Sequence, residues 1–261
     1  MGQEPDQDLK AANASKSGAS PNSTAIAWPP TLIPSPTPLR RIVRSSSIRR
    51  KRAIRSPKAG RMIECESDHE AHFAILAELD PNVTSIFSQP FEWSDWFDGK
   101  KRSHWPDFAI EIAGQPEIHE VKESSKLDDD MEWQTRCEWA EWSANRGIPY
   151  SATLDIHFKA NVQKRCIEHL WFEHARNVDP FLTLRIQSLL ENGPISIGSL
   201  IEMMSPPKPF YDEILALAAQ GKIFIDTAEA FSLTTSVRFP DFANPPPRLV
   251  PFFCPTPGNR P

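Results

Sequence analysis

The sequence predicts an α/β protein in which a mixed-sheet domain is followed by a smaller domain of three helices and a hairpin. Within residues 62–177, segments with helical periodicity alternate with short segments rich in β-branched and aromatic residues. After Pro180, three helical segments come first and two short strand-like segments follow. With 261 residues, the chain is long enough for one large or two small domains.

The 26 prolines lie mostly in the first 60 residues, around Pro206-Pro207 and after Pro240. Residues 1–39 are also rich in Ser, Ala and Asn and have no apolar periodicity, so we predict that they are disordered. Residues 241–261 are predicted to form an extended, Pro-rich tail. The folded part of the chain is therefore expected between these ends.

In the first domain, a helix is expected from Ser67 to Asp80-Pro81, where a capping residue begins it and proline ends it. Three strands follow at residues 83–93, 104–112 and 117–123, separated by turn signals at Asp98-Gly99 and at residues 114–116. A helix at 130–145 ends near Gly147. A strand at 150–156 and a helix at 162–175 complete a mixed α/β sheet domain over residues 62–177.

The second domain is predicted over residues 178–240. Helices are expected at 181–191, 197–204 and 210–220, and strands at 222–226 and 230–234 are expected to pair as a hairpin. Three helices followed by a β-hairpin are typical of a winged helix.

Charge is unevenly distributed along a chain whose net charge is −5. Residues 40–61 form a basic arm with ten Lys and Arg and no acidic residue, whereas residues 62–176 carry 11 basic and 23 acidic residues. Such a division suits an arm that binds phosphates and a body that gathers carboxylates around metal. A solvated linker or a targeting segment is the alternative. The predicted phosphate-binding residues are Arg49, Arg50, Lys51, Arg52 and Arg55.

Several functional classes are disfavoured. The four cysteines show no C-x-x-C spacing, which argues against a zinc knuckle or a redox motif. His69 and His72 are three positions apart instead of the four that a zinc-protease helix needs. No apolar run approaches the length of a membrane span, so we expect a soluble protein inside the cell.

Candidate catalytic residues lie on two neighbouring predicted strands. Pro106-Asp107 opens one of them, and Glu120-Val121-Lys122 lies on the next. Side chains two positions apart on a strand share a face, so Glu120 and Lys122 are expected to point the same way, toward Asp107. Two converging carboxylates form a hard-oxygen site for Mg²⁺ or Mn²⁺, and a nearby lysine could position a water molecule or neutralise charge.

Glu70, on the preceding helix, is expected to face the sheet and to add a third carboxylate, which would permit two metal ions. Each residue also has a structural explanation. Pro-Asp is common in turns, Glu-x-Lys occurs on solvated edge strands, and Ser67-x-x-Glu70 fits a capping box. The combination, in this order and on these elements, favours a PD-(D/E)xK nuclease site.

These segments together resemble the TnsA family, the endonuclease subunit of heteromeric bacterial transposases. The similar stretch covers about residues 63–176, and its matching segments are residues 66–70, 80–83, 89–90, 98–99, 106–108, 120–122 and 147–149. The resemblance implies a restriction-endonuclease-like fold with Mg²⁺, or Mn²⁺ as a substitute, held by three carboxylates. The catalytic residues that carry over are Glu70, Asp107, Glu120 and Lys122. Some members have Gln where this chain has Glu120, and the long basic arm is a less familiar feature.

The resemblance also implies an activity and partners. Members of the family cut the 5′ (non-transferred) strands of double-stranded DNA at transposon ends, together with a TnsB-type DDE transposase and a TnsC-type AAA+ ATPase. A cytoplasmic, nucleoid-associated bacterial protein is expected. A stand-alone restriction or repair nuclease of the same fold is the alternative, and a binding regulator with an inert nuclease domain is a third hypothesis. Because its expected recognition helix carries Asp212 and Glu213, the second domain is predicted to bind mainly protein.

Overall fold

The computed structural model of the chain describes residues 28–29, 32–38, 52–97, 99–158, 161–204, 210–241 and 245–261. Its helices are α1 (Asp68–Leu79), α2 (Asp130–Ala144), α3 (Asn161–Glu173), α4 (Pro180–Leu190), α5 (Ile197–Met203) and α6 (Tyr211–Ala219), with the 3₁₀ helices η2 (Ser124–Asp128) and η3 (Asp155–Phe158). Its strands are β1 (Arg52–Ser56), β2 (Arg61–Cys65), β3 (Val83–Ser88), β4 (Trp93–Phe97), β5 (Lys100–His104), β6 (Phe108–Ile112), β7 (Gln115–Lys122), β8 (Tyr150–Leu154), β9 (Ile195–Ser196), β10 (Phe224–Ile225) and β11 (Ser236–Arg238).

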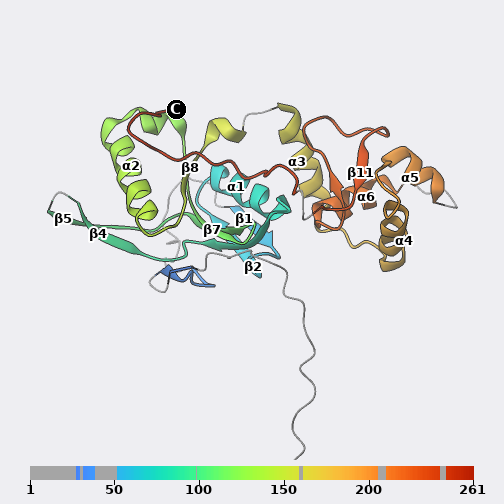
Figure 1. Cartoon of the computed structure of the whole chain (residues 1–261), viewed down its shortest axis with the longest axis horizontal. Coiled ribbons are helices and arrows are strands. Elements are labelled where there is room, and N and C mark those ends of the chain that lie inside the picture. Colours follow the sequence, from blue (N-terminus) through green and yellow to red (C-terminus); the bar gives the residue numbers. More distant parts are fainter. Residues whose placement is uncertain are drawn as a thin grey trace, which may run out of the picture.

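A four-stranded mixed sheet in the order β3-β6-β7-β8 forms the centre of the first domain (Figure 1). β3, β6 and β7 are antiparallel, whereas β8 is parallel to β7. The parallel pairing is possible because η2 and α2 lie between β7 and β8 and provide the long crossover that parallel strands require. The predicted mixed α/β domain is thus present in the structure.

Strand alternation divides the core of this domain into two layers. Phe108 packs toward α1, where its ring centroid lies 4.7 Å from that of Phe73. The next residue, Ala109, points to the opposite face and packs with Ile118 and with Trp139 of α2. Helices α1 and α2 therefore cover opposite faces of the sheet, and residues of β7 that share a face with Ile118 point toward α2.

The predicted strands at 83–93 and 104–112 are divided differently in the structure. β3 ends at Ser88, and Trp93–Phe97 pairs instead with Lys100–His104 as a separate antiparallel hairpin that extends beyond the body (Figure 1). The interruption has a local cause. Gln89 adopts a positive φ of 46°, and Pro90 has no amide hydrogen to donate to a sheet.

Part of the predicted basic arm is folded. β1 and β2 pair as an antiparallel hairpin whose inward side chains, including Ile54 and Ile63, join the core beside α1. The boundary predicted at residue 62 is therefore wrong, because residues 52–61 are needed to cover that core. Residues 39–51 of the chain lie outside the described residues.

Two segments predicted as unstructured ends pack against the first domain. Near the N-terminus, Leu32 is buried, and Trp28 Nε1 donates to Glu111 Oε1 at 3.0 Å, so the prediction of disorder is wrong for residues 28–29 and 32–38. Residues 1–27 lie outside the described part of the chain. Large apolar side chains explain this order, because they bury surface against β3 and β6.

The Pro-rich tail has no helix or strand, as expected, but its described residues 245–261 follow the surface of the first domain. Asp80 Oδ2 accepts from the backbone N–H groups of Leu249 and Val250 at 2.6 and 3.0 Å. Arg248 donates to both carboxylate oxygens of Glu117 at 3.0 and 2.8 Å. The tail is thus held by hydrogen bonds to side chains of the first domain.

The second part contains α4, α5 and α6 with a three-stranded antiparallel sheet in the order β10-β11-β9. The predicted hairpin of 222–226 with 230–234 is wrong, because Phe224–Ile225 pairs with Ser236–Arg238. Residues 230–234 precede this strand in a loop. The loop is closed by a hydrogen bond of 2.8 Å from the backbone N–H of Ser232 to Thr235 Oγ1. Ile195–Ser196 adds a third strand that the sequence did not indicate.

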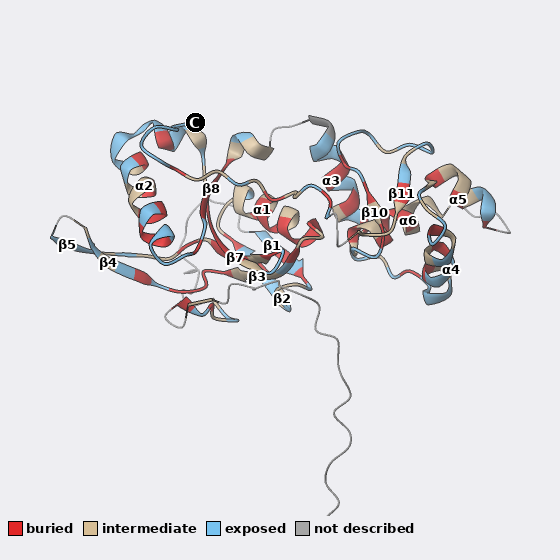
Figure 2. Ribbon diagram, viewed as in Figure 1, coloured by how far each residue is buried: buried red, intermediate tan, exposed pale blue. Residues whose placement is uncertain are grey.

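Helix α3 belongs to the core of the second part although it was assigned to the first domain. Its Ile167 and Leu170 are buried in one cluster with Ile214 and Leu217 of α6. Figure 2 shows buried positions on both helices. Because α3 contributes to this core, the boundary at residue 178 does not separate the two parts. Among the described residues, no helix combines the length and the apolar character that crossing a bilayer requires.

Glu78 links three elements at the base of α1. Its carboxylate accepts from Ser56 Oγ of β1 at 2.5 Å and lies 3.5 Å from His174 Nε2, just after α3. Burial raises its pKa, but these hydrogen bonds and the charge of Lys58 outweigh that effect, so the pKa lies below its usual range. The folded chain therefore holds this proton less tightly than the unfolded chain does.

We expect Glu78 to stabilise the fold at neutral pH and to lose this effect in acid. A lowered pKa contributes stability above about pH 4.5, the usual range of a glutamate, and the contribution disappears as pH falls through the folded-state value. Glu78→Gln should lower the melting temperature at pH 7, and the difference from wild type should narrow between pH 5 and pH 3, as a calorimetric series would show. Glu64→Gln, at an exposed carboxyl on β2, is the control. Parallel curves for Glu78→Gln and wild type would contradict the assignment.

Candidate active site

The four predicted catalytic residues line one cavity of about 270 Å³. Glu70 comes from the first turn of α1, Asp107 from the residue before β6, and Glu120 and Lys122 from the end of β7. The remaining lining residues are also mostly polar. The structure therefore brings together side chains that are separated by up to about fifty positions in the sequence.

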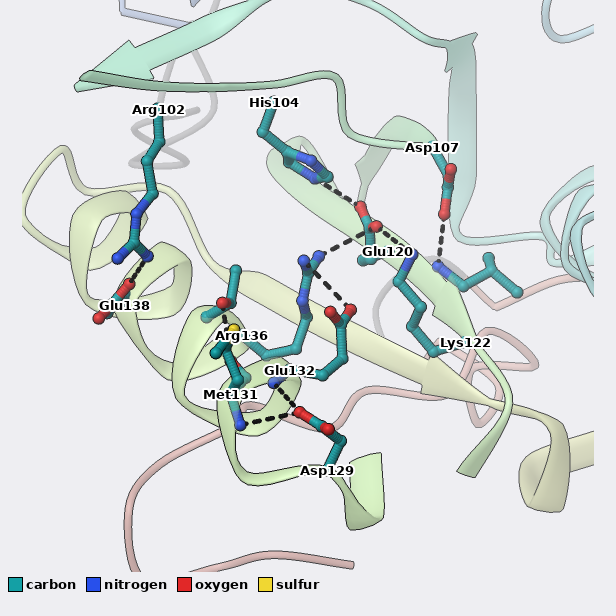
Figure 3. A network of polar contacts seen from close by, with 12 residues as sticks. Arg102, His104, Asp107, Glu120, Lys122, Asp129, Met131, Glu132, Arg136 and Glu138 are labelled. Atoms are coloured by element: carbon teal, nitrogen blue, oxygen red, sulfur yellow. Dashed lines mark hydrogen bonds and ion pairs between the residues drawn. The ribbon is translucent and has the colours of Figure 1, made fainter. Parts of the chain in front are cut away.

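Glu120 lies at the centre of this cluster and is only 1% exposed. Its carboxylate lies 2.8 Å from His104 Nε2, 2.7 Å from Lys122 Nζ and 3.0 Å from Arg136 Nη1 (Figure 3). Burial alone would raise the pKa of Glu120. The three neighbouring groups outweigh burial and hold that pKa well below its usual range. Glu120 is therefore a fixed, ionised carboxylate.

Asp107 is in the opposite electrostatic situation. Burial raises its pKa well above the usual range, and the charge of Glu120 raises it further, while Lys122 offsets part of this effect. One of its oxygens, Oδ2, accepts from the backbone N–H of Val121 at 2.8 Å, which ties the start of β6 to β7 (Figure 3). Asp107 would thus ionise most readily beside an additional positive charge.

Glu70 takes part in the capping of α1 and also faces the cavity. Ser67 Oγ accepts from the backbone N–H of Glu70 at 3.1 Å and donates to its carboxylate at 2.9 Å. The other carboxylate oxygen accepts from the N–H of Glu66 at 2.8 Å, one residue before the predicted capping-box partner. The same side chain lines the cavity. Burial raises the pKa of Glu70, and repulsion from Glu66 and Glu120 adds to it.

Lys122 contributes a positively charged side chain to the site. The attraction of Glu120 raises the pKa of the Lys122 ammonium group; burial opposes this, and Asp107 reinforces it. The ammonium group lies on the same face of β7 as Glu120, because side chains two positions apart on a strand share a face, as the sequence predicts. A protonated lysine thus stands at the edge of a carboxylate cluster.

The donor set fits a divalent cation such as Mg²⁺. Glu70, Asp107 and Glu120 offer carboxylate oxygens, the ligand type that small hard cations prefer. Burial raises the pKa of both Glu70 and Asp107, and repulsion from the Glu120 carboxylate adds to the increase. A bound cation would remove this repulsion.

Arg136 of α2 completes the site, and the sequence analysis did not single it out. Its guanidinium is buried, and besides Glu120 it contacts Glu132 at 3.4 Å (Figure 3). The available signal was its position, since it lies on the same helix face as the buried Trp133 and Ala140. An arginine on an apolar face requires a buried partner, but only the fold shows that the partner is Glu120.

The histidines near the site differ in role. His104, at the end of β5, lines the cavity and packs on Trp139 with ring centroids 5.5 Å apart. His119 points to the opposite face of β7, where it is fully buried and lies 3.1 Å from Glu117. His104 therefore belongs to the candidate active site, whose cavity His69 of α1 also lines, whereas His119 does not.

The described residues of the predicted phosphate-binding arm, Arg52 and Arg55, do not line the cavity. Arg52 forms an ion pair with Asp68 at 2.5 Å, and Arg55 is exposed on β1. Arg49, Arg50 and Lys51 lie outside the described residues. The described part of the arm therefore belongs to the folded domain, and its role in phosphate binding remains a prediction.

A mixed sheet that presents carboxylates and a lysine from adjacent strands defines a nuclease domain of the restriction-endonuclease-like class. Residues 80–155 match the family model of the TnsA-like endonuclease N-terminal domain, so this part of the chain is a TnsA-like endonuclease domain. The match confirms the resemblance found in the sequence and includes Asp107, Glu120 and Lys122, whereas Glu70 precedes it. A search of curated proteins gave no match.

The pairing of Arg136 with Glu120 can be tested through stability. Arg136→Met should destabilise the fold by about 3 kcal/mol or more, because breaking a buried ion pair leaves a charge uncompensated. Arg146→Met is a matched control, since its pair with Asp95 is more than one-third exposed and should contribute about 1 kcal/mol or less. Urea titrations at pH 7 measure both changes. Equal losses in the two variants would show that Arg136 does not compensate Glu120.

Proposed function

We propose that this chain is a Mg²⁺-dependent DNA endonuclease that cuts the 5′ (non-transferred) strands at transposon ends. In this proposal it acts with a TnsB-type DDE transposase and a TnsC-type AAA+ ATPase. The observation that carries the proposal is the convergence of Glu70, Asp107, Glu120 and Lys122 in one polar cavity of a TnsA-like endonuclease domain.

In the proposed reaction, Glu70, Asp107 and Glu120 would hold the metal. When bound, the cation supplies Lewis acidity toward the phosphodiester and lowers the pKa of a coordinated water. Lys122 carries a positive charge beside the same carboxylates and donates hydrogen bonds toward the attacking water or the phosphoryl oxygens. His104 and Arg136 keep Glu120 ionised and in place.

The proposal is tested by cleavage of double-stranded transposon-end DNA with Mg²⁺ and the partner proteins. Asp107→Ala and Lys122→Ala should each reduce the rate by at least about a hundredfold, the scale of removing a group that stabilises developing charge. Glu64→Gln, on an exposed position of β2, serves as the control. Unchanged cleavage by Asp107→Ala would eliminate the assigned site.

Two other hypotheses are separated by the same reagents. Efficient cutting by the purified chain without partners would favour a stand-alone restriction or repair nuclease. Failure of Mn²⁺ to bind at the Asp107 and Glu120 carboxylates would favour a regulator with an inert nuclease domain. The gathering of Glu70, Asp107 and Glu120 around one polar cavity favours the metal-binding enzyme, because carboxylate oxygens are the ligands that hard cations prefer.

For the second part of the chain we propose a winged-helix unit that binds protein. The order α4, β9, α5, α6, β10, β11 supports the winged helix, with α6 in the position of the recognition helix. Yet α6 packs on α3 and buries most of its residues, and its Asp212 contacts Arg176 at 3.3 Å. A buried, acidic helix is poorly suited to reading a DNA groove.

An exposed apolar face supports a protein partner. On α4, Phe181 is 83% exposed and Leu184 is 64% exposed, and three positions separate them, so they share a face. Arg185 of α4 donates to the backbone carbonyl of Met203 at the end of α5. Met203 is also exposed, and this hydrogen bond places it near the exposed face of α4. Exposed apolar surface of this kind is typical of interaction sites.

The double variant Phe181→Ser/Leu184→Ser should weaken binding of the AAA+ partner by at least about tenfold, because two apolar anchors would be removed from the interface. Pull-down titration or calorimetry with the purified partner measures this. The variant should melt as wild type does, since both side chains are exposed. Lys222→Ala is the control. Retained partner binding by the double variant would exclude this face.

A further inference from the structure

The β4–β5 hairpin has one face attached to the body of the protein. Asp95 accepts from Trp142 Nε1 at 2.5 Å and from Arg146 at 3.2 Å. On the partner strand, Arg102 pairs with Glu138 of α2 at 2.6 Å. Because residues directly opposite each other on paired strands share a face, these contacts fix the inner face of the hairpin on and beside α2.

The outer face of the same hairpin is bare. Trp96 is 68% exposed and pairs across the strands with the exposed Lys101. Ser94 and Ser103 form the next cross-strand pair on this face and are also exposed. A solvated tryptophan on a projecting hairpin contributes nothing visible to the core, so folding does not explain its presence.

This outer face is positively charged and continuous with the candidate active site. Lys101, opposite Trp96, is exposed on this face and forms no ion pair with another described residue. The exposed Lys100 lies opposite Phe97 and shares the inner face with Asp95, the described acidic residue of the two strands. Along β5, Ser103 and His104 line the catalytic cavity, so Lys101 stands about 7 to 10 Å from it at the usual rise of a strand.

From this arrangement we infer that the outer face of the β4–β5 hairpin binds the DNA duplex that flanks the cleaved phosphodiester. Lys101 contacts a backbone phosphate, Ser103 supplies a hydroxyl donor beside the cavity, and Trp96 packs on sugar or base edges. Attachment of the inner face to α2 holds this surface in a fixed orientation. The inference rests on the proposed nuclease function and names the element that positions its substrate.

The test measures binding of the full chain to a fluorescent DNA duplex of mixed sequence by anisotropy over a series of salt concentrations. All proteins carry Asp107→Ala so that binding is measured without cleavage. Adding Lys101→Ala should reduce the slope of log K against log salt by about 1, because this lysine neutralises one phosphate. Adding Trp96→Ala should weaken binding by about fivefold or more with little change of slope.

The matched control is Lys222→Ala, which removes the same charge from an exposed position of the second part. An equal decrease of slope in the control would mean that only net charge matters and would overturn the inference. Unchanged duplex binding by both hairpin variants, or no duplex binding by the parent chain, would also overturn it. Normal DNA binding together with impaired partner binding would assign this face to a protein instead.

Cleavage separates this inference from the proposed function. With Asp107 restored, Lys101→Ala should need a higher DNA concentration than wild type for half-maximal cutting, because this lysine contributes to binding of the duplex. If the wild type cuts DNA and the hairpin variants bind DNA as tightly as the wild type, the hairpin surface is refuted and the nuclease function is not. Failure of the wild type to cut with Mg²⁺ and its partners would refute the nuclease function.

Discussion

The buried carboxylate of Glu120 imposes the constraint on which the site depends. An ionised carboxylate at 1% exposure is unstable unless positive groups surround it, and here they come from three elements: His104 of β5, Lys122 of β7 and Arg136 of α2. Each of these elements must therefore stay in register with the others. The same pairings that compensate one charge fix the hairpin, the sheet and the crossover helix around the cavity.

Three carboxyl groups are thus gathered around the candidate active site. Asp107 and Glu70 lie close enough to Glu120 for repulsion to raise the pKa of both. The fold tolerates this because Glu70 also caps α1 and because Asp107 also ties β6 to β7 through the N–H of Val121. Residues proposed to bind metal thus also hold the backbone in place, so the site is organised before any ligand arrives.

The rest of the chain supports this domain from outside. The C-terminal tail is held at Asp80 and Glu117, and the N-terminal segment is held by Trp28 and Leu32. Helix α3 joins the first domain to the second part because its apolar residues complete the core around α6. In the second part, α6 is mostly buried, whereas α4 leaves Phe181 and Leu184 exposed.

The sequence by itself determined the order of elements and the candidate residues. Periodicity located α1, β7, α2, α4 and α6 to within about two residues, and strand alternation placed Glu120 and Lys122 on one face. The tertiary structure decided the contributions of Arg136 and His104, the separate β4–β5 hairpin, the true partner of β10, the order of the tail and the membership of α3. The reason is physical: local sequence encodes periodicity and capping, whereas the partner of a buried charge or an edge strand depends on contacts between residues far apart in the chain.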